Sequence, residues 1–237
     1  MRLPAGYVDY DRGSFRVIAM RWELDEMVGL LTGPERHLAT EAGVGRGGTR
    51  RVVLPGGKAV YLRKFLRGGA VRYLLRDLYL LRPERPLVEL VVTETARGAG
   101  CPVPHVLAAY VEEATIGYRG WLVTEAVDGA RPLIDAFAEA SESRRAELFE
   151  QAGRAIRRLH AAGVYHVDLG GHNILVGPDD RVTIVDFDRA TLGVPNDGRR
   201  AAAGVRRFWR SMDKLTAAKS MDVDGEARRW LQAGYGS

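Results

Sequence analysis

The stretch HVDLGGHNILVGPDDRVTIVDFD, residues 166–188, decides how this chain folds. It sets a His, an Asp and an Asn within eight residues, and two further Asp follow a short apolar segment. That segment has two apolar runs around a Gly-Pro-Asp-Asp turn, a pattern typical of a buried β-hairpin. Such a hairpin brings Asn173 and Asp186 face to face. We therefore expect the apolar strands to be a rigid scaffold for these two polar side chains.

Two parts of this stretch are similar to known motifs. HVDLGGHN resembles the catalytic loop of the protein-kinase-like fold, and VDFD resembles the metal-binding triplet that follows it. Phosphoryl transfer needs metal ions and an oriented hydroxyl rather than covalent help from the protein. The resemblance implies that Asp168 accepts or orients the proton of the attacking hydroxyl. Asn173 would hold one Mg²⁺, and Asp186 would hold the Mg²⁺ that bridges the phosphates of ATP.

The resemblance also requires a phosphate-binding turn and a cation upstream of the loop. GVGRGGTRRVVL supplies a glycine-rich turn, with Gly45, Gly47 and Gly48, ahead of a basic strand. The next strand, AVYLRKF, offers Arg63 or Lys64 to reach the phosphates. Because neighbouring residues of a strand point to opposite faces, only one of the two can do so. Strand periodicity does not choose between them.

The remaining nucleotide contacts are expected on a helix and on the connector between two lobes. In PLVELVVTETARGAG, Glu89 is the natural acid to pair with the cation, since Glu94 would lie about 140° further round the helix. In GWLVTEAVDG the resemblance makes Thr124 the gate position. The carbonyl of Glu125 and the N–H of Val127 would then contact adenine.

The chain as a whole alternates strands and helices in the order of an α+β protein. The patterns predict strands within residues 14–22 and 103–127, a hairpin at Gly56-Gly57, helices over residues 22–31, 70–82, 87–97 and 143–162, and a helical tail. The resemblance implies one two-lobed kinase-like domain over residues 1–237. It would have a small β-rich N-lobe of about residues 1–125, a hinge at about 125–129 and a reduced helical C-lobe of about 130–237.

Several departures from protein kinases indicate a small-molecule acceptor. Only 51 residues follow Asp186, too few for a long activation segment and a helical substrate platform, and no Ala-Pro-Glu is present. Asp188 stands where the metal triplet commonly ends in glycine, and Val167 stands where protein kinases commonly carry arginine. These losses favour a kinase without activation-loop control.

Within that group the chain resembles the lipopolysaccharide inner-core kinases, in particular those that act on 3-deoxy-D-manno-octulosonic acid (Kdo). YLRKFLRGGAVRYLLRDLYL, AGCPVPHVLAAY, HVDLGGHNILV, IVDFDRA and RRFWRSMDKL carry the resemblance, which spans residues 43 to about 216. It implies transfer of the ATP γ-phosphate to the 4-hydroxyl of Kdo on Kdo-lipid A. This family has arginine where protein kinases have lysine, which favours Arg63, and a guanidinium can clamp phosphate oxygens bidentately.

The charge of the chain fits an anionic partner. The net charge is +5, and arginine-rich segments lie at residues 63–85 and 199–210. Such segments attract phosphates. A helix over residues 70–82, with leucines on one face and arginines on the other, could lie on the anionic inner membrane. Alternatively, its leucines pack into the small lobe and its arginines are simply solvated.

Composition limits the remaining classes of protein. Cys101 is the single cysteine, so no internal disulfide can form, and we expect a bystander thiol. No apolar run of 18 residues and no signal core is present, which predicts a cytoplasmic protein without a transmembrane segment. The resemblance implies that it is a peripheral protein on the cytoplasmic face of the inner membrane, where Kdo-lipid A would lie. Nucleic-acid binding is not expected, because no aromatic-basic RNA-binding motif occurs. The oligomeric state stays open.

Two other functions remain possible at this point. A kinase of the same fold could act on a core heptose, another small molecule or a protein Ser or Thr, with the same catalytic residues. A non-catalytic nucleotide-binding pseudokinase is the other, and the joint presence of Asp168, Asn173 and Asp186 argues against it. His160, His166 and His172 do not form a zinc motif. We expect His166 to hydrogen-bond the backbone and hold the loop.

Overall fold

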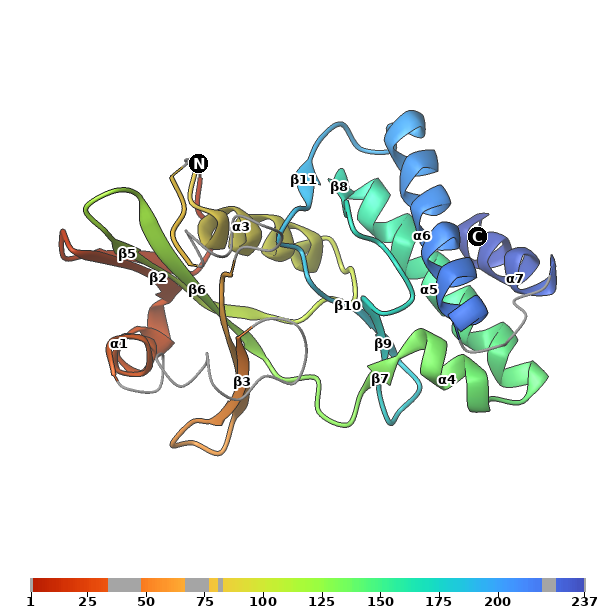
Figure 1. Ribbon diagram of the computed structural model, residues 1–237, viewed down its shortest axis with the longest axis horizontal. Helices are drawn as coiled ribbons and strands as arrows, with labels where there is room; N and C mark the ends of the chain where they lie inside the picture. The colour runs from red at the N-terminus through yellow and green to blue at the C-terminus, as the bar shows by residue number, and fades with distance from the viewer. Residues whose placement is uncertain (1, 34–47, 67–76, 81–82, 219–224, 237) are drawn as a thin grey trace. The chain divides into compact units, whose positions relative to one another are not determined.

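The computed structural model describes residues 2–33, 48–66, 77–80, 83–218 and 225–236, and its architecture is mixed α+β. An antiparallel sheet forms in the N-terminal part of the chain, and helices dominate the C-terminal part (Figure 1). Two compact units can be distinguished. The N-terminal unit comprises residues 1–94 and 105–126, and the C-terminal unit comprises residues 95–104 and 127–237.

The N-terminal unit is built on a six-stranded antiparallel sheet with the strand order β1-β2-β5-β6-β4-β3. Its strands are β1 (Tyr7–Asp11), β2 (Phe15–Met20), β3 (Thr49–Val53), β4 (Ala59–Lys64), β5 (Val106–Glu113) and β6 (Tyr118–Glu125). The predicted hairpin at Gly56-Gly57 is confirmed as β3 and β4, and Gly57 has the positive φ of +82° that its turn requires. Strand β1, which pairs with β2 along its whole length, was not predicted.

A helix covers each face of this sheet. Helix α1 (Leu24–Thr32), preceded by a 3₁₀ turn (Arg21–Glu23), packs Met27 and Leu31 against one face, where Leu62 and Trp121 are buried. Helix α3 (Arg85–Gly98) packs Leu87 and Leu90 against the other face. Since successive strand residues alternate between faces, the parity of a strand position decides which helix its side chain meets.

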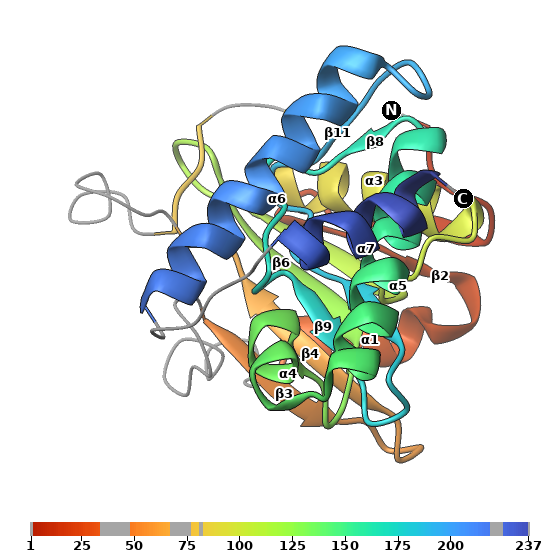
Figure 2. The ribbon, with the colours of Figure 1, turned by 90° about the vertical axis from the view of Figure 1, so that its right-hand side faces the viewer.

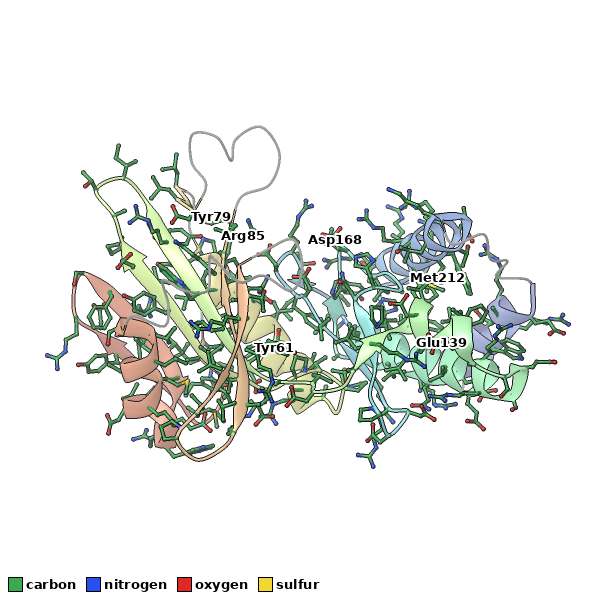
Figure 3. All side chains as sticks on the ribbon, turned by 60° about the horizontal axis from the view of Figure 1, so that its bottom comes forward. Tyr61, Tyr79, Arg85, Glu139, Asp168 and Met212 are labelled. Carbon is green, nitrogen blue, oxygen red and sulfur yellow. The ribbon has the colours of Figure 1, made fainter. Side chains whose placement is uncertain are left out.

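The helix expected over residues 70–82 is wrong for the part that can be examined. Residues 70–76 and 81–82 lie outside the described residues, whereas residues 77–80 are described and are not helical. Tyr79 forms a β-bridge with Tyr118, with both N–O distances at 2.8 Å, and the two rings stack at 5.6 Å. The ring of Tyr79 also receives the guanidinium of Arg85, and Figure 3 shows the two side chains close together. At residues 77–80, tertiary packing therefore overrides the predicted helical pattern.

The described part of the C-terminal unit, from residue 127 on, has four helices: α4 (Leu133–Glu139), α5 (Glu142–Ala161), α6 (Gly198–Ala218) and α7 (Gly225–Gly236). Helix α5 matches the predicted helix at residues 143–162 and buries its expected apolar side. Helix α7 lies directly against it (Figures 1 and 2). A Cβ at Gly153 of α5 would lie 2.2 Å from the carbonyl oxygen of Leu231, so this crossing requires glycine.

Short strands complete the C-terminal unit. Strands β9 (Ile174–Val176) and β10 (Val182–Ile184) form the predicted apolar hairpin, and β7 (Arg131–Pro132) pairs with β9. Strands β8 (Val164–Tyr165) and β11 (Thr191–Leu192) form a second small sheet. Among the described residues, no helix combines the length and the apolar character needed to cross a membrane.

Candidate active site

The loop between β8 and β9 is held by a buried histidine. The Nε2–H of His166 donates to the carbonyl oxygen of Val185 at 3.0 Å, and its ring meets Phe187 edge-on at 4.9 Å. Burial lowers the pKa of His166, although the Val185 carbonyl and the nearby carboxylates of Asp186 and Asp168 oppose that effect. The imidazole is therefore neutral at neutral pH and ties the loop to Val185, the residue directly after β10, as the sequence predicted.

Asn173 joins the loop to the hairpin. Its Nδ2 donates to the carbonyl oxygen of Asp168 at 2.9 Å, and its own carbonyl accepts from the N–H of Val185 at 2.9 Å. Val185 is thus the residue opposite Asn173, and Asp186 comes one position later, at the same end of the hairpin. Asp186 has a φ of +65°, which a residue other than glycine seldom adopts, so the backbone leaves the strand direction at this carboxylate.

Asn173 and Asp186 have the chemistry of a magnesium site. The amide nitrogen of Asn173 donates to the carbonyl of Asp168, so the Oδ1 oxygen of this buried side chain is the atom that could bind a metal. An amide oxygen and a carboxylate are hard ligands, and Mg²⁺ commonly takes one or two protein oxygens with the rest from phosphates and water. The described residues contain no group of three or more His, Cys, Asp or Glu suited to a metal. A magnesium ion that shares its ligands with a nucleotide does not need such a group.

Two arginines flank the carboxylate of Asp168. The NH2 nitrogen of Arg207, on α6, donates to Oδ1 at 2.5 Å, and the NH1 nitrogen of Arg189 lies 3.9 Å from Oδ2. The side chain of Asp168 keeps 34% of its surface exposed, so the carboxylate remains open to a ligand. Sequence reasoning missed both arginines. It noted the basic segment that contains Arg207, but no local spacing relates residues 39 positions apart.

In the N-terminal unit the structure brings Arg63 and Glu89 together. The guanidinium of Arg63, on β4, forms an ion pair with the carboxylate of Glu89, on α3, and the side chain of Glu89 is only 4% exposed. Lys64 points to the opposite face, where its Nζ lies 2.6 Å from Asp77 Oδ2 and 5.1 Å from the ring centroid of Trp121. Helix α3 covers the face of the sheet to which Arg63 points. Because Lys64 points to the other face, Glu89 of α3 pairs with Arg63.

Glu94, the other acid of α3, has a different partner. Its Oε1 accepts a hydrogen bond from the N–H of Val106 at 2.8 Å, at the start of β5. Its carboxylate also lies 3.8 Å from Nε2 of His105. Glu94 therefore anchors the sheet, and the preference for Glu89 over Glu94 agrees with the geometry.

The predicted glycine contacts can be examined only in part. Gly45 and Gly47 lie outside the described residues. Gly48 directly precedes β3, is buried, and accepts a hydrogen bond from the N–H of Lys64 at 2.9 Å. This bond continues the β3–β4 hairpin past its open end.

The predicted adenine contacts lie at the end of β6. Thr124 is within the strand, opposite Tyr61 of β4. The N–H of Glu125 donates to the carbonyl of His105 at 2.9 Å, and its side chain pairs with Lys58 at 2.9 Å. Among the described residues no partner takes the N–H of Val127. That N–H is therefore available to a ligand.

The chain is similar to known proteins over most of its length. The family described as "Lipopolysaccharide kinase (Kdo/WaaP) family" matches residues 34–226. A protein of Stenotrophomonas maltophilia (strain K279a) named 3-deoxy-D-manno-octulosonic acid kinase is 34% identical over 193 residues, which cover 80% of this chain and 76% of that protein. A protein of the same name from Xanthomonas euvesicatoria pv. vesicatoria (strain 85-10) is 35% identical over 203 residues, covering 84% and 79%. The family match includes every candidate residue described above.

Proposed function

The chain belongs to the lipopolysaccharide kinase (Kdo/WaaP) family, and on that premise we propose that it transfers the γ-phosphate of ATP to the 4-hydroxyl of a Kdo residue on Kdo-lipid A. It is a Kdo kinase of lipopolysaccharide inner-core biosynthesis, a phosphotransferase. One observation carries the proposal. The family match contains Asp168, Asn173 and Asp186, the three residues that the chemistry of phosphoryl transfer requires.

The proposed fold is the two-lobed kinase-like fold, formed by a single domain over residues 1–237. In this proposal, the antiparallel sheet and its two covering helices form an N-lobe over about residues 1–125. The four helices and the short hairpin form a reduced C-lobe over about residues 130–237. The break between the two compact units after residue 126 supports a hinge at about residues 125–129.

In the proposed mechanism the C-terminal unit handles the acceptor and the metal. Asp168 orients the attacking hydroxyl and takes its proton, which typically contributes about 10²–10⁴-fold to the rate. Asn173 and Asp186 would hold Mg²⁺. When bound, Mg²⁺ neutralises the charge that develops on the phosphates. His166, neutral and hydrogen-bonded to the backbone, keeps the loop in place.

The N-terminal unit and the connector would bind ATP. Arg63, held by Glu89, would clamp phosphate oxygens with two parallel hydrogen bonds. The backbone around Gly45, Gly47 and Gly48 would cover the phosphates. The carbonyl of Glu125 and the N–H of Val127 would contact adenine, and the availability of the Val127 N–H among the described residues supports this assignment.

We place the enzyme at the cytoplasmic face of the inner membrane as a peripheral protein, because its lipid-linked acceptor would lie there. The basic segments at residues 63–85 and 199–210 support attraction to anionic headgroups. Arg72 and Arg76 lie outside the described residues, but a vesicle-binding assay can test them. Arg72→Glu/Arg76→Glu should bind anionic vesicles more weakly than wild type. Undiminished binding would show that this segment does not contribute to membrane binding.

The decisive experiment measures transfer of labelled phosphate from ATP to purified Kdo-lipid A with Mg²⁺, with Asp168→Ala as the blank. Labelled lipid with wild type alone supports both the chemistry and the acceptor. Mapping the phosphate on the sugar tests the 4-hydroxyl. Transfer only to another sugar or to protein would refute the acceptor but keep the site, and ATP binding without any turnover would indicate a pseudokinase. Asp186→Ala should abolish the Mg²⁺-dependent activity, and wild-type turnover in that variant would remove Asp186 from the metal site.

A further inference from the structure

Helix α6 lies directly on the loop that carries Asp168. A Cβ at Gly170 would lie 2.4 Å from Oγ and 2.9 Å from Cβ of Ser211, and a Cβ at Gly171 would lie 2.3 Å from Sδ of Met212. All three distances are shorter than those that Cβ atoms keep in real structures, so a side chain at position 170 or 171 would force Ser211 or Met212 to move. Met212 is fully buried. The loop and the helix can be traced from the labelled Asp168 and Met212 (Figure 3).

This contact determines which residue of α6 faces the loop. Arg207 precedes Ser211 by four residues, so both lie on the same side of the helix. The guanidinium of Arg207 thereby reaches Oδ1 of Asp168 at 2.5 Å. The packing of α6 on the loop thus explains both the contact of Ser211 with Gly170 and the ion pair between Arg207 and Asp168.

Asp168 is consequently held from two directions. Its main-chain carbonyl accepts from Nδ2 of Asn173 at 2.9 Å, and its side-chain Oδ1 accepts from Arg207. A carboxylate has two oxygens, and this arrangement leaves Oδ2 for another ligand. Arg189, at 3.9 Å from Oδ2, is too far for a hydrogen bond.

We propose that Arg207 is a positioning residue for Asp168, which orients the carboxylate so that Oδ2 faces the acceptor hydroxyl. The inference rests on the proposed function, in which Asp168 takes the acceptor proton. A small displacement of a reacting group can reduce the rate by about 100-fold. Arg207 therefore acts on turnover through Asp168 and not on the binding of ATP.

The chain contains a matched control for this ion pair. Arg228 of α7 donates to Asp213, which is on the same helix α6, at 3.0 Å, and the side chains of Arg228 and Arg207 are both 47% exposed. Arg228→Ala thus removes the same charge from a similarly exposed arginine–aspartate pair with no link to the loop. Loss of activity in both variants alike would indicate a general effect of charge or of α6 stability.

The test measures kcat and the KM for ATP with Kdo-lipid A for wild type, Arg207→Ala, Arg207→Lys and Arg228→Ala. We expect Arg207→Ala to lose about 10- to 100-fold in kcat with an unchanged KM for ATP and an unchanged thermal midpoint. Arg207→Lys should recover part of the loss. Added guanidinium at low millimolar concentration should partly rescue Arg207→Ala but not Asp168→Ala, because only the former lacks a guanidinium and keeps its carboxylate.

Two results would overturn the inference. One is wild-type kcat in Arg207→Ala. The other is a loss that guanidinium does not rescue and that comes with a lowered thermal midpoint, which would make Arg207 a purely structural residue. Measuring ADP release in the absence of lipid, with water as the acceptor, distinguishes a wrong role for Arg207 from a wrong choice of acceptor. If wild type releases ADP in an Asp168-dependent manner but does not label Kdo-lipid A, the acceptor is wrong, and Arg207→Ala must still lower that release. If no Asp168-dependent release occurs with either acceptor, both proposals fail.

Discussion

The molecule contains two arginine–carboxylate pairs at its candidate functional positions. They differ in which partner is the proposed functional group and in how deeply the pair is buried. In the N-terminal unit, Glu89 is buried between α3 and the sheet and pairs with Arg63, the proposed phosphate-binding group. In the C-terminal unit, the proposed catalytic group is Asp168, which pairs with Arg207 at the surface. On these proposals, one ion pair positions a cation for phosphates, and the other positions a carboxylate for a hydroxyl.

Burial determines how each pair is connected to stability. Removing one partner of a buried pair leaves the other charge desolvated, which typically costs about 3–5 kcal/mol. An exposed pair contributes about 0–1 kcal/mol, because water and salt screen it. Substitutions at the Glu89 pair should therefore change both folding and activity, whereas substitutions at the Asp168 pair should change activity alone.

The largest expected effect is at Asp168. Asp168→Ala should lower turnover by about 10²–10⁴-fold, since the attacking hydroxyl loses its proton acceptor. The free energy of unfolding, measured by urea denaturation, should change by less than about 1 kcal/mol, because the pair is exposed. A large loss of stability in this variant would break the distinction between the two pairs.

The second effect is at Glu89. Glu89→Ala should reduce the free energy of unfolding by about 2–4 kcal/mol, because the partly buried guanidinium of Arg63 loses its partner, and it should raise the KM for ATP. Glu139→Ala is the matched control, since Glu139 pairs with Arg131 in an exposed pair. That control should lose less than about 1 kcal/mol. Equal losses in the two variants would show that burial does not distinguish these pairs.

A third, smaller effect separates Arg63 from its neighbour. Arg63→Lys should raise the KM for ATP by about 10-fold, because an ammonium cannot reproduce the two parallel hydrogen bonds of a guanidinium. Lys64→Arg should change that KM by no more than about 2-fold, since Lys64 faces Asp77 on the other side of the sheet. Steady-state kinetics with varied ATP measures both. The reverse result would make Lys64 the phosphate-contacting cation.

The smallest effect concerns a buried group of the C-terminal unit that has no charged partner in its contacts. His160 hydrogen-bonds Tyr235 at 2.7 Å and stacks on Tyr165, and burial lowers its pKa to about 4. The unfolded chain binds a proton at this residue below about pH 6.5, whereas the folded chain does not, so stability falls as the pH decreases from there toward 4. Between pH 7 and 6 the free energy of unfolding should decrease by about 0.5–1 kcal/mol more in wild type than in His160→Gln. Equal slopes would show that His160 is not held neutral.

Local pattern predicted much of this molecule. The hairpin at Gly56-Gly57, the apolar hairpin after Asn173 and the helix α5 each have a periodicity or a turn that short-range sterics explain. The preference for Glu89 over Glu94 followed from helical geometry, and the structure pairs Glu89 with Arg63. The motifs within residues 166–188 predicted the enzyme class by resemblance, and family membership then confirmed it.

What failed depended on contacts between distant parts of the chain. Tyr79 pairs with Tyr118 at the start of β6, and residues 77–80 are therefore not part of the helix that the leucine spacing predicted. Strand periodicity left the choice between Arg63 and Lys64 open, and only the resemblance favoured Arg63. The pairing of Arg63 with Glu89 depends on which face of the sheet α3 covers. Arg207 reaches Asp168 only because α6 crosses the loop. None of these relations is contained in the residues nearby in sequence.

The close approach of α6 to Gly170 also limits how this chain can vary. Any side chain at position 170 would overlap Ser211, so position 170 can accept an alanine only if position 211 loses its own side chain or α6 moves. The two positions are therefore coupled: Gly170→Ala and Ser211→Gly should each be harmful or neutral alone and compensate when combined. If α6 shifted as a unit instead, Arg207 would leave Asp168 with it. Because Gly170 and Gly171 pack directly against α6, substitutions in the loop and in the helix should affect one another.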